Sequence, residues 1–216
     1  MERNATEVRG AGRRQRRKDA RPGEIVAAAI DVFAESGFGA AKMEEIARRA
    51  GVSKGTLFVY FPTKQDLFRA VAQIMLSANL GRLESVVIEN DRPLRELIPL
   101  LLGQAAAAAE DRRFPVIIRL LIAESRSFPD LARVWHDEVV AKVLMIVTAA
   151  IERAQARGEV RAGDARLFAF SLAGPMIAGV IFREVFGATG VALPDLRALA
   201  AQHAQTVLLG MLEPDR

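Results

Sequence analysis

Residues that can donate hydrogen bonds to an anion are concentrated between positions 44 and 68. This segment reads EEIARRAGVSKGTLFVYFPTKQDLF, and in it Lys54 and Lys64 enclose Thr56 and Tyr60. Side chains of these types contact the phosphates and the base edges of nucleic acids. The segment therefore predicts a surface for nucleic acid, with solvated surface lysines as the alternative.

Two short helices must position these side chains. Apolar spacing predicts the first over about 42–50, with Ile46 and Ala47 inward, and a second that Ser53 caps and that ends before Pro62. Helices this short are marginal in water unless other parts of the chain pack against them. A three-residue turn containing glycine joins the two, which is the spacing of a helix-turn-helix, whose second helix enters the DNA major groove.

Helical direction separates the two faces of the second helix. Leu57 and Phe61 point inward. A glycine inside a helix costs up to about 1 kcal/mol, and it is reasonable where the backbone must approach another surface closely. The predicted groove-facing residues are Lys54, Gly55, Thr56, Phe58, Val59 and Tyr60, and packing is the open alternative for Phe58.

Lys64 falls in the first turn of a predicted fourth helix, which Thr63 caps with Asp66 three residues further on. Free backbone N–H groups and an ammonium group together favour a phosphate, so the sequence predicts a phosphate clamp at Lys64. The predicted buried stripe of this helix is Phe68, Val71, Met75 and Leu83, and its predicted end is near Val87.

The rest of the chain is also predicted to be helical, which makes the fold class all-α. Apolar residues recur at spacings of three and four, and glycine or proline marks the ends of the segments. A first helix is predicted from Pro22 to Gly37, and it supplies the apolar surface that the short pair lacks. Further helices are predicted at about 94–109, 114–126, 130–157, 164–186 and 195–212.

The excess positive charge is confined to residues 1–21. This arm holds seven arginines and one lysine against three acidic residues, a net charge of +5, which leaves −1 for the remainder of a chain whose total is +4. Such an arm is most often a solvated tail, but its composition is also expected of an arm that contacts nucleic acid or an anionic membrane. The residues predicted to reach the minor groove or the phosphates are Arg13, Arg14, Arg16 and Arg17.

The composition excludes several classes of function. No cysteine occurs in 216 residues, so disulfides, thiolate metal sites and cysteine nucleophiles are excluded. His136 and His203 stand far apart, without partners at the spacing of metal ligands. With no cofactor motif recognisable, the sequence predicts neither an enzyme, nor a metal site, nor a cofactor.

The sequence also predicts a cytoplasmic location and no membrane partner. The arginine-rich N-terminus lacks the apolar region of a signal peptide. The longest uncharged run, Leu167 to Phe182, is shorter than the roughly 20 residues that a spanning helix needs, and it contains Pro175.

Residues 22–68 resemble the DNA-binding signature of the TetR family of bacterial transcriptional repressors. The resemblance rests on IARRAGVSKGTLFVYFPTKQDLF, with Gly51-Val52-Ser53, Gly55-Thr56-Leu57, Tyr60-Phe61 and Lys64 at the expected places. It implies a nine-helix, all-α homodimer with three DNA-binding helices and a six-helix effector-binding and dimerisation domain. The corresponding boundaries are a basic flexible arm at 1–21, a helix-turn-helix domain at 22–66, and the effector-binding and dimerisation domain at 67–216.

Two positions depart from the family pattern. Ala41-Lys42 stands where the family usually has a threonine that caps the second helix and touches a phosphate. Lys42 can replace the phosphate contact but not the cap. Phe58 stands where a tyrosine is common, so it offers only an apolar contact. Lys42 and Ser53 complete the predicted DNA-binding set.

The C-terminal helices hold more apolar residues than two packed faces need, so a pocket for an apolar or amphipathic ligand is predicted among them, with ordinary core as the alternative. The predicted pocket residues are Met75, Phe114, Ile118, Leu121, Met145, Phe170 and Met176. Pairing the last two helices across a twofold axis would bury the surplus. The predicted dimer residues are Leu172, Gly174, Ala178, Phe182, Leu199, Val207 and Met211.

The motif and the resemblance together predict a regulator that binds double-stranded DNA at a pseudo-palindromic operator as a homodimer. The expected function is a repressor that an unidentified small-molecule effector releases. A DNA-binding dimer without an effector and an activator are the alternatives.

Overall fold

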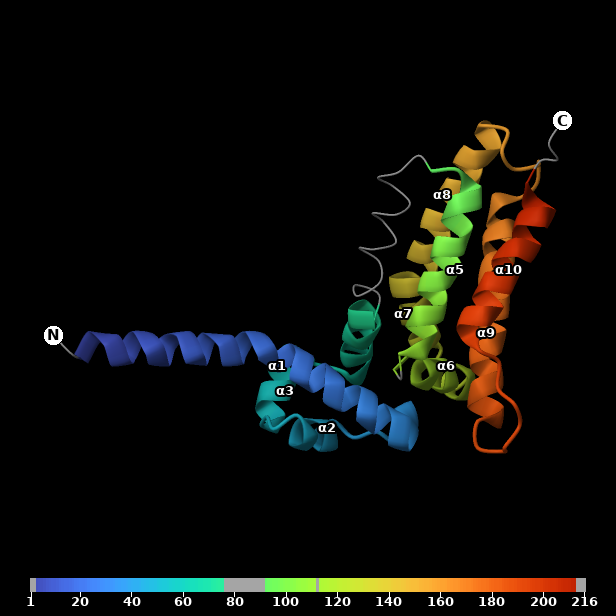
Figure 1. Cartoon of the computed structure of the whole chain (residues 1–216). Helices are drawn as coiled ribbons and strands as arrows, with labels where there is room; N and C mark the ends of the chain where they lie inside the picture. Colours follow the sequence, from blue (N-terminus) through green and yellow to red (C-terminus); the bar gives the residue numbers. More distant parts are fainter. Residues whose placement is uncertain (1–2, 76–91, 112, 213–216) are drawn as a thin grey trace.

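The computed structural model of the chain describes the backbone of residues 3–75, 92–111 and 113–212, and the side chains of these ranges from residue 21 onward. Every regular element within these ranges is helical, which confirms the all-α prediction. An N-terminal unit lies beside one end of a group of upright helices (Figure 1). The elements are α1 (Arg3–Ala40), α2 (Met43–Arg49), α3 (Lys54–Tyr60), a helix over 64–75, α5 (Leu94–Glu110), α6 (Arg113–Glu124), α7 (Pro129–Trp135), η1 (His136–Val140), α8 (Ala141–Ala156), α9 (Ala165–Phe186) and α10 (Leu196–Met211).

An aromatic centre holds the N-terminal unit together. Phe33, Phe38 and Phe68 are at most 1% exposed, and their ring centroids lie between 5.5 and 6.4 Å apart. Ile46 of α2 and Leu57 of α3 are completely buried in the same core. Burying a side chain of this size contributes about 1.5–3 kcal/mol, so packing supplies the stability that α2 and α3 lack as isolated helices.

The start of α1 differs from the prediction. The helix begins at Arg3, and Pro22, the predicted first residue, lies inside it. The arginine, glutamine, lysine and alanine residues before Pro22 are good helix formers, so the helix extends through them despite the missing proline N–H. The side chains of the arm, those of Arg13, Arg14, Arg16 and Arg17 included, lie outside the described residues, as do Leu83 and Val87.

Gly37 breaks α1 where the sequence predicted its end. Its backbone angles, φ 77° and ψ 171°, are not helical, and they belong to a region that only glycine populates readily. A Cβ atom at this position would also overlap the carboxylate of Glu124, which comes from α6. The turn between α1 and α2 therefore depends on the absence of a side chain at residue 37.

The predicted single helix over 130–157 is three segments. α7 and α8 are separated by the π-helical turn η1. A π-turn inserts one extra residue into the helical ladder, and apolar spacing does not reveal it because the chain remains helical on both sides.

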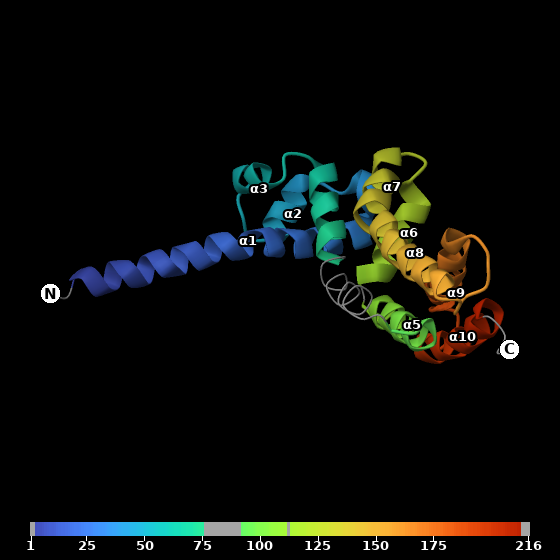
Figure 2. The ribbon, with the colours of Figure 1, turned by 90° about the horizontal axis from the view of Figure 1, so that it is seen from above.

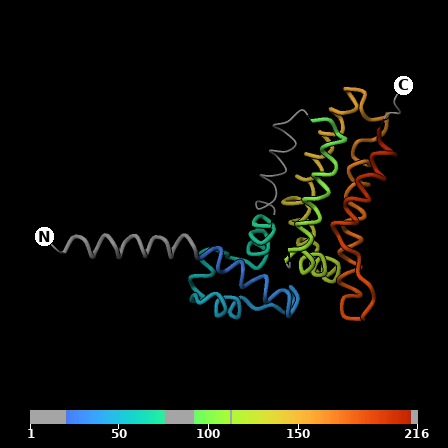
Figure 3. Tube along the Cα trace, in the orientation of Figure 1, coloured from blue at the N-terminus to red at the C-terminus, as the bar shows by residue number. Residues whose placement is uncertain are grey.

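The C-terminal unit is a group of long helices with α6 at its boundary. α5, α9 and α10 run alongside one another (Figure 3), and α6 and α7 lie between them and the N-terminal unit (Figure 2). α6 belongs to both cores. Ile117 and Leu120 are buried against α1 and its neighbours, while Phe114 also packs against the core of the C-terminal unit. Movement of α6 would therefore disturb both units.

α9 is the most apolar helix. By length and composition alone this 22-residue helix could cross a membrane. An 18-residue stretch of it has a mean hydropathy of 1.7, and a third of that stretch is buried inside the protein. Its outer side exposes large apolar residues, namely Leu167, Phe170, Ile177, Phe182, Val185 and Phe186. Neighbouring exposed apolar residues of this kind are typical of an interaction surface.

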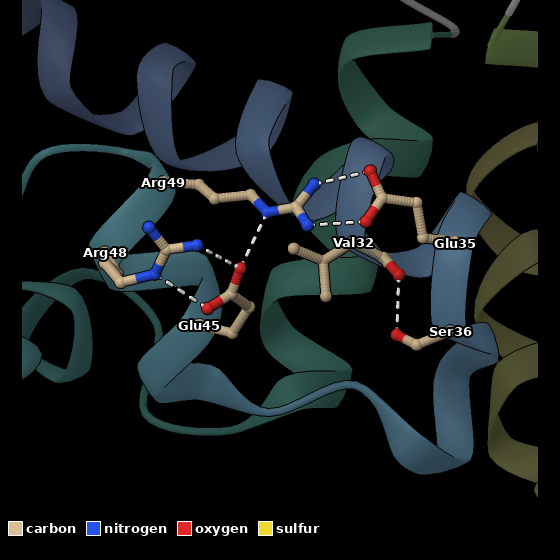
Figure 4. Close-up of polar contacts among 6 residues, drawn as sticks. All are labelled: Val32, Glu35, Ser36, Glu45, Arg48 and Arg49. Carbon is tan, nitrogen blue, oxygen red and sulfur yellow. Dashed lines mark hydrogen bonds and ion pairs between the residues drawn. The ribbon is translucent and has the colours of Figure 1, made fainter.

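Ion pairs fix α2 against α1 (Figure 4). The guanidinium of Arg49 donates to both carboxylate oxygens of Glu35, at 2.6 and 2.5 Å, and to Glu45 at 2.8 Å. Arg48 donates to the same Glu45 at 2.9 and 2.6 Å. These hydrogen bonds lower the pKa of Glu45 to about 2, and the bond from Arg49 lowers the pKa of Glu35. One arginine thus joins α2 to α1, an ion pair that sequence spacing did not predict.

Replacing Gly37 by alanine is expected to lower the free energy of unfolding by roughly 1–3 kcal/mol, because a side chain there has a strained backbone and overlaps Glu124. Urea denaturation of the purified variant measures the loss. The matched control is Gly103→Ala, since Gly103 is exposed within α5 and has open space around it. The control should gain up to about 1 kcal/mol. Equal stability of Gly37→Ala and the wild type would show that the break in α1 is not required.

The Arg49 network should make the fold sensitive to acid. The lowered pKa values of Glu45 and Glu35 mean that these carboxylates stabilise the fold above an unfolded-state pKa near 4.3, and that this contribution is lost as the pH falls toward about 2. Between about pH 5 and pH 2 the melting temperature of the wild type should therefore fall more steeply than that of Arg49→Met. Arg133→Met, an exposed arginine of α7, should keep the wild-type profile. Parallel profiles for Arg49→Met and the wild type would refute the linkage.

Candidate nucleic-acid interface and ligand cavity

The turn between α2 and α3 is built by local hydrogen bonds. Gly51 adopts φ 65°, and the N–H of Val52 donates to the carbonyl of Ala47 at 3.0 Å. The hydroxyl of Ser53 accepts from the N–H of Thr56 at 3.1 Å, which confirms the predicted cap of α3. These bonds satisfy groups that a helix start leaves unpaired, so the orientation of α3 is fixed by the turn itself.

The outward face of α3 carries four of the six predicted groove residues. The exposed residues are Lys54, Gly55, Phe58 and Val59. Of the two apolar side chains among them, Val59 is 80% exposed and Phe58 is 38% exposed. A Cβ on Gly55 would meet nothing closer than 3.9 Å, so nothing within the protomer excludes a side chain at this position. The open space fits an external surface that approaches the backbone closely.

The other two predicted groove residues are half-buried. The Thr56 hydroxyl lies 2.8 Å from that of Ser53, and the Tyr60 ring lies 6.5 Å from Phe61 and packs against the core. Both residues sit at the edge of the outward face, where their side chains also support α3.

Two further lysines differ in their surroundings. The Lys54 ammonium lies 2.6 Å from a carboxylate oxygen of Glu44, and both side chains are more than half exposed. Lys42 is exposed at the start of α2 and makes no side-chain cap, as the sequence indicated. Both lysine side chains are therefore exposed to solvent.

Lys64 has a different role from the predicted phosphate clamp. Its ammonium donates to the carbonyls of Phe38, Gly39 and Ala41, the last two at 3.0 Å, and lies 4.7 Å from the centroid of the Phe38 ring. Burial lowers the pKa of Lys64, and the nearby carboxylate of Glu124 opposes this shift. An ammonium has three donors, and all three are used within the turn between α1 and α2. These carbonyl partners lie more than 20 residues away in the sequence, so no local sequence pattern predicts them.

The helix that begins at Lys64 has the predicted cap. The N–H and hydroxyl of Thr63 donate to the Asp66 carboxylate at 3.2 and 2.6 Å, and the Asp66 N–H donates back to the Thr63 hydroxyl at 3.0 Å. This reciprocal cap holds the first turn, so that the Lys64 stem leaves the helix toward the turn between α1 and α2.

α6 also contributes to that turn. Glu124 accepts a hydrogen bond from the N–H of Gly39 at 2.9 Å. Arg119 donates to the carbonyl of Ala34 at 3.2 Å and to the carboxylate of Glu184 in α9 at 3.4 Å. The last carbonyls of a helix lack partners within it, and the break at Gly37 creates such an end. Arg119 of α6 thus satisfies a carbonyl near the broken end of α1, and Glu124 accepts from an N–H just beyond the break.

A cavity of about 360 Å³ lies between α5, α6, η1, α8 and α9. Five of the seven predicted pocket residues line it, namely Met75, Phe114, Ile118, Phe170 and Met176. Leu121 does not, because it lies on the side of α6 that packs against the N-terminal core. Met145 is 66% exposed on the outer side of α8. Helical periodicity located the helices, but it did not determine which of two apolar faces lies toward the cavity.

The cavity wall is almost entirely apolar. Its charged side chains are Asp111 and Arg113, which lie at the junction of α5 and α6 and form an ion pair, with Nε of Arg113 2.9 Å from Asp111. This pair lowers the pKa of the Asp111 carboxyl. Trp135, 7% exposed, and the π-turn residues Val139 and Val140 add to the wall. The shape and lining suit a mainly apolar small molecule.

The predicted dimer residues divide into three groups. Leu172 and Met211 are 5% and 3% exposed and belong to the core of their own protomer, so their assignment to an interface is corrected. Leu199 and Val207 are partly buried against the same core. Gly174, Ala178 and Phe182 are exposed on the outer side of α9. A helix that is apolar on all sides gives no periodic signal to distinguish an inner face from an outer one.

Known protein families match both structural units of the chain. A family model described as bacterial regulatory proteins of the tetR family matches residues 25–71, and a second, described as the tetracyclin repressor-like C-terminal domain, matches residues 93–193. A solved structure of a putative TetR-family regulator from Mesorhizobium loti superposes with a TM-score of 0.74 at 25% identity, covering 91% of this chain and 99% of that one.

Two curated relatives are transcriptional or metabolic regulators. The HTH-type transcriptional regulator RutR of Escherichia coli is 34% identical over 134 residues, which are 62% of this chain and only 55% of RutR. The fatty acid metabolism regulator protein of Bacillus subtilis is 26% identical over 145 residues, 67% of this chain and 73% of that protein. The two family models fall on the two structural units in order, and on this basis the chain belongs to the TetR family of bacterial transcriptional regulators.

Proposed function

We propose that this regulator is a repressor that binds a pseudo-palindromic operator as a homodimer and is released by a small, mainly apolar ligand. The observation that carries the DNA-binding part is the face of α3, where a fixed helix presents an ammonium, an open glycine and two exposed apolar side chains. A helix of this kind in a helix-turn-helix reads base edges in the major groove.

The DNA-contacting residues have distinct roles in this proposal. Gly55, Phe58 and Val59 face the groove, where apolar side chains contact thymine methyl groups. Lys42 and Lys54 hold the phosphates on either side. Ser53, Thr56 and Tyr60 support α3 from its edges, and Arg13, Arg14, Arg16 and Arg17 of the arm contact the minor groove or the backbone. Phosphate contacts set the position of the helix, and groove contacts supply the sequence preference.

Dimerisation is proposed through the outer side of α9 and the neighbouring surface of α10. Leu167, Val185 and Phe186 are exposed there, as is Leu209 of α10 at 88%. Exposed Gly174 and Ala178 allow a second helix to approach closely. A twofold axis through this surface brings the same surface of two identical chains together. The same symmetry places the two copies of α3 on successive turns of the operator.

The ligand is proposed to occupy the cavity in the C-terminal unit. Its wall favours a molecule with a long apolar part, and a relative that covers two thirds of this chain is a regulator of fatty acid metabolism. A fatty acid or a fatty acyl ester therefore becomes the first ligand to examine. Arg113 is the positive side chain that could bind the carboxylate or other anionic end of such a ligand, and it would then give up its hydrogen bond to Asp111.

α6 is proposed to carry the effect of the ligand to the DNA. Its first residues, Arg113, Phe114 and Ile118, line the cavity, while Arg119 and Glu124 further along hold the end of α1. A ligand that displaces the start of α6 would therefore move the caps at its other end. The change in operator affinity can be no larger than the difference in ligand affinity between the two arrangements.

The direct test of the function is a selection of bound fragments from genomic DNA, repeated with and without palmitic acid and its coenzyme A ester. A repressor with this effector should retain a short palindromic sequence, lose it when the ligand is added, and lower the expression of a reporter placed behind that sequence. Increased reporter expression would indicate an activator, and retention with every ligand would indicate a dimer without an effector.

Lys42→Ala is expected to weaken binding to all DNA sequences and to flatten the slope of log affinity against log salt by about one unit, since one phosphate contact is lost. Val59→Asn should change the preference among sequences and leave the slope unchanged. Fluorescence anisotropy with the selected fragment measures both variants. Lys142→Ala, at a partly exposed lysine of α8 that pairs with Glu138, is the control and should match the wild type. An unchanged salt slope in Lys42→Ala would remove Lys42 from the interface.

Glu124→Gln tests the link through α6. Allosteric coupling usually changes affinity by about 5–150-fold, and in this variant the ligand-induced loss of operator affinity is expected to fall to within about threefold of unity. The ligand should still bind with wild-type affinity, because Glu124 does not line the cavity. Glu152→Gln, an exposed glutamate of α8, is the control. Wild-type coupling in Glu124→Gln would show that the signal passes elsewhere.

A further inference from the structure

The outward face of α3 offers few hydrogen-bonding groups to a base pair. The side chains that read base edges by strong or paired hydrogen bonds are arginine, lysine, asparagine, glutamine, aspartate and glutamate. Of these, α3, whose 7 residues the structure describes in full, contains only Lys54. The Thr56 hydroxyl lies 2.8 Å from that of Ser53, and Tyr60 is half-buried at the edge of the face. α3 is therefore poorly equipped to read bases by hydrogen bonds.

Lys54 already has partners within the protomer. Its ammonium lies 2.6 Å from a carboxylate oxygen of Glu44 and 5.8 Å from the centroid of the Phe58 ring. A lysine ammonium is a point charge on a flexible stem, so it suits a phosphate better than the fixed geometry of a base edge. Base readout is therefore left to the rest of the face.

The rest of the outward face is apolar. Phe58 and Val59 are its exposed side chains, and Gly55 lies three and four residues before them, so all three share one face of the helix. A Cβ atom on Gly55 would meet nothing closer than 3.9 Å, and the absence of this atom lets the backbone approach a base pair closely. Such an approach brings both apolar side chains against the base edges.

The apolar group that a base presents in the major groove is the methyl group at C5 of thymine. The base 5-methylcytosine carries the same methyl group at the same ring position, whereas uracil and cytosine carry hydrogen there. At C4 the two methylated bases differ, because thymine has an acceptor oxygen and 5-methylcytosine has a donor amino group. A protein face that contacts the methyl group and forms no hydrogen bond at C4 does not distinguish the two.

We propose that α3 recognises the C5 methyl group of pyrimidines through Phe58 and Val59, so that 5-methylcytosine substitutes for thymine in the operator. The inference rests on the proposed function, because it concerns the same groove-facing residues and the same DNA. Methylation of a cytosine within a half-site then adds a contact that the unmethylated sequence lacks. One buried methyl group should raise the affinity of such a site about fourfold.

The first experiment changes single bases in the fragment selected from genomic DNA and measures affinity by fluorescence anisotropy. Deoxyuridine in place of a contacted thymine removes only the methyl group and should weaken binding about fourfold. Replacing the same T·A pair by C·G should weaken binding at least as much, and 5-methylcytosine in that C·G pair should restore the affinity to within about twofold of the original.

Readout by hydrogen bonds gives the opposite order of affinities. Uracil keeps the acceptor oxygen of thymine, and 5-methylcytosine does not. Unchanged affinity with deoxyuridine at every thymine would therefore overturn the proposal. A 5-methylcytosine fragment that binds no better than its cytosine form would overturn it as well.

The second experiment assigns the methyl contact to side chains. In Val59→Ala or Phe58→Ala the loss of affinity caused by deoxyuridine should fall from about fourfold to less than about twofold at the thymine that the side chain contacts. Both side chains are exposed, so truncation leaves the core of the N-terminal unit intact. Lys42→Ala is the control, and it should keep the full fourfold loss while binding all fragments more weakly, since it affects a phosphate contact. A full loss in both alanine variants would assign the uracil effect to DNA shape and overturn the proposal.

The two experiments separate this inference from the proposed function. A chain that retains no genomic fragment contradicts the proposed function and this inference with it. A chain that retains a palindromic fragment and binds its deoxyuridine form equally well is still a sequence-specific DNA-binding protein, and only the methyl readout is contradicted.

Discussion

The arrangement of the N-terminal unit depends on how the broken end of α1 is satisfied. Gly37 stops the helical ladder, and the backbone groups around it need partners from elsewhere. Lys64 supplies three donors, Glu124 accepts from Gly39, and Arg119 donates to the carbonyl of Ala34. Each of these hydrogen bonds is modest alone, because the groups are exposed or only partly buried, but together they tie α6 and the helix that begins at Lys64 to one turn. They determine where α2 and α3 lie relative to α6.

The same contacts explain why α6 is suited to connect the two units. α6 contributes Ile117 and Leu120 to one core and Phe114 to both. At one end it borders the cavity, and toward the other end Arg119 also reaches Glu184 of α9. A displacement at the cavity therefore cannot be absorbed by α6 alone, since close-packed interiors transmit strain. The ends of α1 and α9 are the first elements that it would reach.

Local signals predicted the fold and the helix-turn-helix well, because their causes lie within a few residues. Ser53, Gly51 and the Thr63–Asp66 pair act on neighbouring backbone groups, and the structure has them in these roles. The errors arise where the cause is distant. The partners of Lys64 lie across a turn that folding creates, and the largely apolar α9 does not reveal from its spacing that Leu172 faces inward. Sequence spacing defines faces, but tertiary packing decides which face is covered.

The free energies of these interactions also indicate which lysines can exchange their partners for another group. The pair between Lys54 and Glu44 is exposed on both sides, and such pairs contribute about 0–1 kcal/mol, so a phosphate can replace the glutamate at little cost. If Lys64 turned to a phosphate, three carbonyls would lose their donor, at a cost near 1–3 kcal/mol for each that stays buried. The sequence alone does not distinguish Lys54 from Lys64 as candidates for a phosphate contact. Their partners in the folded chain leave Lys54 in an exposed ion pair and hold Lys64 in the turn between α1 and α2.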